Sequence, residues 1–111
     1  MSIAASTAPL PESSVYNATK AAVRAFARTW TTDLKDRRIR VNAVSPGYID
    51  TLPWRATDAG EKSMKMISNS IPFGRFGTAD EIPKAVVFLA SADSSYVIGT
   101  ELFVDGGFAQ V

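Results

Sequence analysis

A tyrosine and a lysine stand four positions apart near the start of the chain, at Tyr16 and Lys20. On a helix this spacing puts both side chains on one face, within reach of each other or of a shared ligand. A phenol titrates near pH ~10, which is too high for efficient proton transfer at neutral pH. An ammonium about 4 Å away stabilises the phenolate by up to roughly 4 kcal/mol at an effective dielectric of about 20. The pair could therefore transfer a proton, or it could be an ordinary solvated helix face.

The composition limits the other chemistry that is available. The 111 residues include no cysteine and no histidine, which excludes disulfides, thiolate nucleophiles, metal sites with Cys or His ligands and a Ser-His-Asp triad. The net charge of +1 gives no basic footprint for nucleic acid. No apolar run is long enough to span a bilayer, and the first residues lack the features of a signal peptide. We therefore expect a cytoplasmic protein without a nucleic-acid or membrane partner.

Apolar spacing and turn residues predict the elements that must position the pair. A capping-box pattern marks the clearest helix start, with Pro83 at the fifth helical position. In order, the predicted elements are a loop over residues 1–12, a helix from Ser13 or Ser14 to about Lys35, a strand over Ile39–Ser45, a short helix over Glu61–Ile67, a helix opening with Thr78–Glu81, and a strand over Glu101–Val104.

The alternation of helices and strands predicts an α/β layer with parallel strands. Two strands do not make a stable parallel sheet alone, because such sheets are covered on both faces, so the predicted architecture is truncated. Asn42, a polar residue in an apolar strand, is predicted to form hydrogen bonds that fix neighbouring loops. The helical stripe of Val23, Phe26 and Trp30 is predicted to belong to the core.

Four segments follow one another in the order and spacing of known signatures: Tyr16–Ala22, Arg40–Gly47 with Ile49 and Thr51, Gly74–Gly77 with Glu81 and Ile82, and Gly99–Gly107. Together they resemble the C-terminal portion of a subunit of the short-chain dehydrogenase/reductase family, over essentially the whole chain. The resemblance implies the C-terminal part of a Rossmann-like, doubly wound parallel sheet, truncated. Residues 1–111 would form a partial NAD(P)-binding domain, with a mobile substrate loop at about residues 52–75.

The resemblance also implies roles for individual residues. Tyr16 matches the family's general acid/base, and Lys20 matches the lysine that binds the nicotinamide ribose and favours ionisation of the tyrosine. The turn that matches the nicotinamide-lining segment contains Pro46, Gly47, Ile49 and Thr51. Independently, a glycine at a strand's carboxyl end permits close backbone approach where ligands bind open α/β sheets. The plain alternative is a turn that ends a strand.

The catalytic serine has two candidates. The family's spacing would place it at Ile3, so the neighbouring Ser2 is the first candidate, with one extra residue in the following loop. Ser6 is the second candidate. Ser2 could equally be an ordinary terminal residue.

In the predicted substrate loop, apolar side chains could line a substrate pocket or pack within a short helix; these are Trp54, Met64, Met66 and Ile67. The substrate itself is left open beyond a carbonyl or alcohol.

The resemblance implies an NAD(P)-dependent oxidoreductase that transfers hydride between nicotinamide and a small-molecule carbonyl or alcohol, with no metal. It also implies a homo-oligomer, either a dimer or a tetramer. The choice between NAD and NADP is left open. The sequence contains no G-x-G-x-x-G-like segment, and the resemblance covers somewhat under half of a normal subunit. We therefore expect weak dinucleotide binding and little turnover from the isolated chain. The alternative is a catalytically inactive fragment that acts, if at all, as an interaction module.

Overall fold

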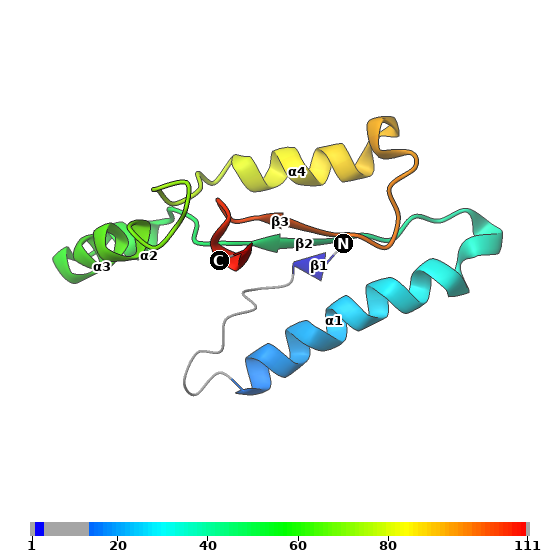
Figure 1. The fold of residues 1–111 in the computed structure, drawn as a ribbon, viewed down its shortest axis with the longest axis horizontal. Helices are drawn as coiled ribbons and strands as arrows, with labels where there is room; N and C mark the ends of the chain where they lie inside the picture. The colour runs from blue at the N-terminus through cyan, green and yellow to red at the C-terminus, as the bar shows by residue number, and fades with distance from the viewer. Residues whose placement is uncertain (1, 4–13, 111) are drawn as a thin grey trace.

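A three-stranded parallel sheet lies at the centre of the fold (Figure 1). The computed structural model describes residues 2–3 and 14–110. The strands pair in the order β1 (Ser2–Ile3), β2 (Ala43–Pro46) and β3 (Glu101–Val104), with Ser2 opposite Ala43 and Ala43 opposite Glu101. The prediction of an α/β fold with parallel strands is confirmed. The prediction of a loop over residues 1–12 is wrong at Ser2–Ile3, because a two-residue strand has no alternation to read.

The central strand begins later than predicted. Residues 39–42 are connected to the segment before β3, where the Val41 carbonyl accepts from the Gly99 amide at 2.8 Å. Just before β2 begins, the side chain of Asn42 makes two further hydrogen bonds to this segment. Its Nδ2 donates to the Val97 carbonyl at 3.0 Å, and its Oδ1 accepts from the Thr100 amide at 3.1 Å. The predicted role of Asn42 is confirmed. It ties the turn before β3 to the start of β2.

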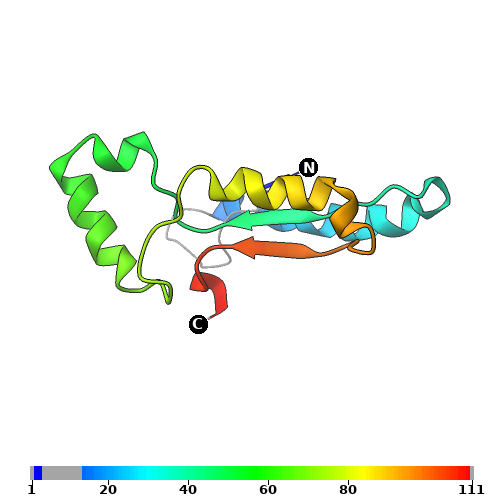
Figure 2. The ribbon, with the colours of Figure 1, turned by 90° about the horizontal axis from the view of Figure 1, so that it is seen from above.

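Two long helices cover opposite faces of the sheet (Figure 1). They are α1 (Ser14–Asp33) and α4 (Glu81–Ala90), and α1 is followed by a 3₁₀ turn, η1 (Lys35–Arg37). Both views place the start of α1 at the end of the molecule where β2 and β3 finish (Figures 1 and 2). Across residues 2–3 and 14–110, no helix is long and apolar enough to cross a membrane.

A pair of short helices extends beyond the carboxyl ends of the strands (Figure 2). The helices are α2 (Leu52–Arg55) and α3 (Asp58–Ser68). The predicted short helix is present as α3 and is longer than expected, because Thr57 caps it by accepting from the Gly60 amide at 3.0 Å. Helix α2 was not predicted. It has a proline in its first turn, a position at which the backbone amide makes no hydrogen bond within the helix, so the proline is tolerated there.

The helix α4 begins two residues later than predicted. One half of the capping box is formed, since Glu81 Oε2 accepts from the Thr78 amide at 2.6 Å. The Thr78 hydroxyl donates instead to Asp80 Oδ1, also at 2.6 Å. The helix therefore begins at Glu81, and Pro83 is its third residue rather than its fifth. In the first turn a proline costs no helical hydrogen bond.

The aromatic stripe of α1 is not core in the part of the chain that the structure describes. Phe26 and Trp30 are 53% and 47% exposed, and their rings stack at 5.4 Å between centroids. They border an apolar groove of about 580 Å³ that passes from α1 to α4, beside residues 39–42. Other residues that line it are Val23, Val41, Val86 and Leu89.

Candidate active site

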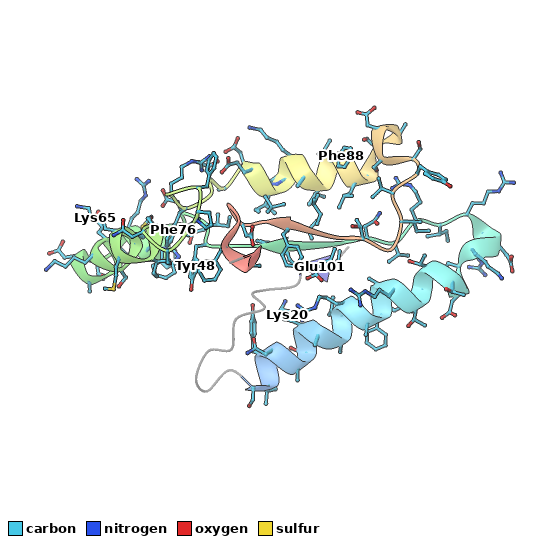
Figure 3. The ribbon with its side chains drawn as sticks, in the orientation of Figure 1. Lys20, Tyr48, Lys65, Phe76, Phe88 and Glu101 are labelled. Atoms are coloured by element: carbon cyan, nitrogen blue, oxygen red, sulfur yellow. The ribbon has the colours of Figure 1, made fainter. Side chains whose placement is uncertain are left out.

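The first turns of α1 bring together the two residues that the spacing singled out. Lys20 Nζ lies 5.5 Å from the centroid of the Tyr16 ring. The ring is half exposed, and Lys20 lies on the side of α1 that is turned toward the sheet (Figure 3). A cation this close to an aromatic ring is attracted by the ring's quadrupole. The helix thus presents a phenol and an ammonium as one unit.

The turn after β2 is fixed by its neighbour, β3. Pro46 is the last residue of β2, and the Gly47 amide donates to the Val104 carbonyl at 3.0 Å. A Cβ atom added at Gly47 would lie 2.6 Å from both Cα and Cβ of Asp105. The close approach that a glycine permits here is therefore made by the turn after β3. Packing against Asp105 is thus sufficient to explain why position 47 is a glycine, without any ligand.

The rest of this segment is held to the start of α4. Ile49 forms an isolated parallel bridge with Gly77, with the Asp50 amide donating to the Gly77 carbonyl at 2.8 Å and the Gly77 amide to the Tyr48 carbonyl at 2.9 Å. Thr51 is exposed, precedes α2, and makes no side-chain capping bond to it. The backbone of this segment is therefore held in place, and the Thr51 hydroxyl is not used to cap α2. Both properties fit a polar ligand such as a nicotinamide carboxamide.

The two serine candidates are placed differently. Ser2 lies in β1, paired with Ala43 of β2, and so belongs to the strand beside the candidate turn. Ser6 lies outside the residues that the structure describes. The backbone of Ser2 is thus part of the sheet, whereas its side chain also lies outside the described atoms.

Four aromatic rings join α2 to the segments that follow β2 and β3, and sequence reasoning missed them as a group. Tyr48 stacks on Phe76 at 5.3 Å and meets Phe108 and Trp54 edge to face at 5.1 and 6.2 Å (Figure 3). Trp54 also meets Phe76 at 5.4 Å. Phe76 is buried. Tyr48 and Trp54 are six residues apart, but Phe76 and Phe108 are distant from them in the sequence, so no local spacing indicates the cluster.

A polar cluster beneath α1 was also missed. The buried Ser45 hydroxyl donates to Glu101 Oε1 at 2.6 Å, and Arg24 Nη1 lies 3.7 Å from the same oxygen. The side chains of Arg24 and Glu101 are 23% and 15% exposed. The available signal was that Arg24 follows Lys20 by one helical repeat and so shares its face.

An ion pair joins the residue at the end of α2 to the segment that precedes this helix. Arg55 at the end of α2 donates two hydrogen bonds to Asp50, which precedes the helix. These bonds, and then the charge of Arg55, hold the pKa of Asp50 below its usual value. Among the residues described, no group of three or more acidic, His or Cys side chains could hold a metal ion.

Comparison with known proteins gives consistent matches. A family model described as enoyl-(acyl carrier protein) reductase matches residues 1–109. The 3-oxoacyl-[acyl-carrier-protein] reductase FabG of Thermotoga maritima is 42% identical over 87% of this chain and 39% of its own length. The dehydrogenase/reductase SDR family member 6 of Rattus norvegicus is 37% identical over 97% of this chain and 46% of its own length.

The fold matches as well as the sequence does. The crystal structure of a short chain dehydrogenase family protein from Francisella tularensis superposes with a TM-score of 0.83 at 26% identity, over 95% of this chain and 47% of that chain. The chain thus spans less than half the length of each of these proteins.

Proposed function

We propose that this chain, which belongs to the short-chain dehydrogenase/reductase family, carries the proton-transfer residues of an NAD(P)-dependent oxidoreductase acting on a carbonyl or alcohol. The observation that supports this most directly is the Lys20 ammonium 5.5 Å from the Tyr16 ring centroid, at the end of the molecule where β2 and β3 finish. In open α/β sheets this is the end at which ligands bind. The relatives' names, which describe reductases and dehydrogenases, agree with the class of reaction.

In the proposed mechanism, side chains of the protein donate and accept the proton. In the direction of reduction, the Tyr16 phenol donates its proton to the substrate oxygen as the carbonyl carbon is reduced; in the direction of oxidation, the phenolate takes the proton back. The Lys20 ammonium stabilises the phenolate in both directions. Ser2 is the proposed second donor to the substrate oxygen, with Ser6 as the alternative.

A bound NAD or NADP would supply or accept the hydride. The residues proposed to hold its nicotinamide end are Tyr16, Lys20, Pro46, Gly47, Ile49 and Thr51. The support for this set is the backbone of the turn, which β3 and Gly77 fix, together with the uncapped hydroxyl of Thr51. A turn that is already held by other contacts pays little ordering cost when a ligand binds.

Replacing the phenol tests the assignment. In the full-length protein, Tyr16→Phe should lower kcat by about 100-fold or more, because general acid catalysis is lost. Cofactor affinity should change by less than about 2-fold, because the ring is kept and the other five residues proposed to hold the cofactor are untouched. Tyr96→Phe is the matched control, since Tyr96 is fully exposed. Turnover by Tyr16→Phe at the wild-type rate would refute the role of Tyr16.

The alternative is a catalytically inactive fragment that acts as an interaction module. The chain spans less than half the length of these relatives, and its 111 residues contain no G-x-G-x-x-G-like segment. We expect the isolated chain to bind NADH and NADPH weakly in calorimetric titration. Micromolar affinity for either cofactor would contradict this expectation and would favour an active chain.

Three further properties are proposed together with the function: the substrate class, the location and the assembly. We propose a small-molecule carbonyl or alcohol substrate, a cytoplasmic location and assembly as a homo-oligomer, either a dimer or a tetramer. The substrate class and the assembly are proposed from the family to which the chain belongs. The location is proposed from the sequence, which has an ordinary composition and a net charge of +1. Sedimentation of the full-length protein measures the assembly directly.

A further inference from the structure

We propose that Arg24 and Glu101 are positioning residues for the proton-transfer pair: together they fix α1 over the sheet so that Tyr16 and Lys20 stand at the reacting end. This inference rests on the proposed function. It concerns a polar contact between the first helix and the last strand, away from the atoms proposed to react.

Three elements meet at one carboxylate oxygen. Glu101 Oε1, on β3, accepts from the Ser45 hydroxyl of β2 at 2.6 Å and lies 3.7 Å from Arg24 Nη1 of α1. Ser45 is 3% exposed, so its hydroxyl holds the carboxylate from a fixed position inside the sheet. In Figure 3, Glu101 extends from β3 into the space between the sheet and α1, the same space that Lys20 faces. The carboxylate is thus oriented by the sheet and paired with the helix.

The contact lies on the same helix face as the catalytic candidates. Tyr16, Lys20 and Arg24 follow one another at intervals of four residues within α1. Residues spaced in this way lie along one side of a helix, each about one turn from the next. A displacement of Arg24 relative to β3 would therefore be carried along the rigid helix to Lys20 and Tyr16.

The arrangement is a poor way to gain stability. Arg24 Nη1 is buried and, within the described part of the chain, has no hydrogen-bond partner. Its 3.7 Å distance to Glu101 Oε1 is an ion-pair distance and too long for a hydrogen bond. A partly buried ion pair of this kind is often replaced by apolar residues with no loss of stability, because desolvation offsets the attraction. What the charges provide is a preferred position for the helix.

The test separates position from stability by replacing both charges with apolar groups. The double variant Arg24→Met/Glu101→Leu is made in the full-length protein in a Ser45→Ala background, so that no buried hydroxyl loses its acceptor. It should keep the thermal unfolding midpoint of Ser45→Ala while kcat falls by about 10-fold or more, since a misplacement of about 1 Å can cost about 100-fold in rate. The KM for substrate should change less than kcat. The matched control, Asp80→Leu/Lys84→Met, removes the exposed ion pair of α4 and should leave kcat unchanged.

Two further variants keep the test decisive if the double variant fails to fold. Glu101→Gln preserves the shape of the side chain and its acceptor for Ser45 but removes the charge, so it should show the same loss of kcat in a folded protein. The charge exchange Arg24→Glu/Glu101→Arg should recover part of that loss. Unchanged kcat in folded Glu101→Gln would overturn the proposal.

A distance measurement tests the position of the helix without relying on activity. The chain has no cysteine, so spin labels can be attached at Ala21→Cys on α1 and Val87→Cys on α4, both exposed positions. We expect one narrow distance distribution between the labels, broadened or shifted by Glu101→Gln. If the wild-type protein transfers no hydride, the proposed function fails and the distances alone decide. In that case broadening supports the positioning role, and an unchanged distribution overturns it.

Discussion

At the scale of single residues, the candidate site depends on contacts that cross between elements. Gly47 meets the backbone of Asp105, and Asp105 in turn accepts from the Gly107 and Ala109 amides at 2.8 Å each. The turn that is proposed to line the nicotinamide and the turn that ends β3 are therefore packed as one unit. A change in either turn is expected to move the other.

A methyl group at Gly47 tests this packing. Gly47→Ala would place Cβ 2.6 Å from Asp105 Cα, a contact that only a backbone shift can relieve. We expect a loss of unfolding free energy of about 1–3 kcal/mol in urea denaturation, as for other overpacked sites. Thr51→Ala, an exposed change in the same segment, should stay within about 0.5 kcal/mol of wild type. Equal stability of the two variants would show that the two turns are not tightly packed.

Local spacing explains which residue contacts could be predicted. The proximity of Tyr16 and Lys20 follows from their separation on one helix, which needs no tertiary information. The Ser45–Glu101 hydrogen bond depends on the register of β2 against β3, which is set by the whole sheet. The same is true of the clash at Gly47, whose neighbour Asp105 lies in a distant turn. Spacing along one element is visible in a sequence, whereas register between elements is not.

At the scale of elements, the start of α4 carries the most strongly shifted carboxylates. Hydrogen bonds from Lys84 first and Thr78 second lower the pKa of Asp80 to about 2. A hydrogen bond from Arg75, and then one from the Thr78 backbone, lower the pKa of Glu81 to about 2. The capping-box pattern predicted the bond that the Thr78 amide donates to Glu81, because that motif is local. The pairing of Glu81 with Arg75 was not predicted, because Arg75 lies in an irregular loop.

These shifts predict acid lability of the start of α4. A carboxylate with a depressed folded-state pKa contributes stability that is fully present above its ordinary value and is lost as the pH falls through the folded value. For Glu81 that window runs from about 4.5 down to about 2. The protection factors of the amides in the first turn of α4, taken relative to the intrinsic exchange rate at each pH, should fall as the pH is lowered through this window. Glu81→Gln should show weaker protection at neutral pH and less dependence on acid; the same pH dependence as wild type would contradict the assignment.

At the scale of the whole molecule, the sheet does not separate its two covering helices along their full length. Beside residues 39–42 the groove passes between α1 and α4, and the stacked Phe26 and Trp30 rings border it. The sequence predicted these rings as core because their helical periodicity is typical of a buried face. Periodicity shows which face of a helix is apolar, but not whether this chain supplies what covers it.

The groove predicts self-association of the isolated chain. Apolar surface of this extent is normally covered, so the sedimentation coefficient should rise with protein concentration. Trp30→Lys should reduce association, because it puts a charge on the groove wall. Tyr96→Lys is the control, because that side chain is fully exposed and lies away from the groove. A wild-type chain that stays monomeric at high concentration would contradict this prediction.

The strand register has a consequence for the time course of folding. Ser2 pairs with Ala43, and Ala43 pairs with Glu101, so each rung of the sheet joins residues that are far apart along the chain. Such pairings close large loops before any ladder forms, which makes folding slow compared with helix formation. During synthesis, α1 can form soon after it emerges from the ribosome, whereas β2 must wait for Glu101–Val104 before its second edge is covered. Until then the proposed proton-transfer pair, Tyr16 and Lys20, lies on a helix that has no completed sheet beneath it.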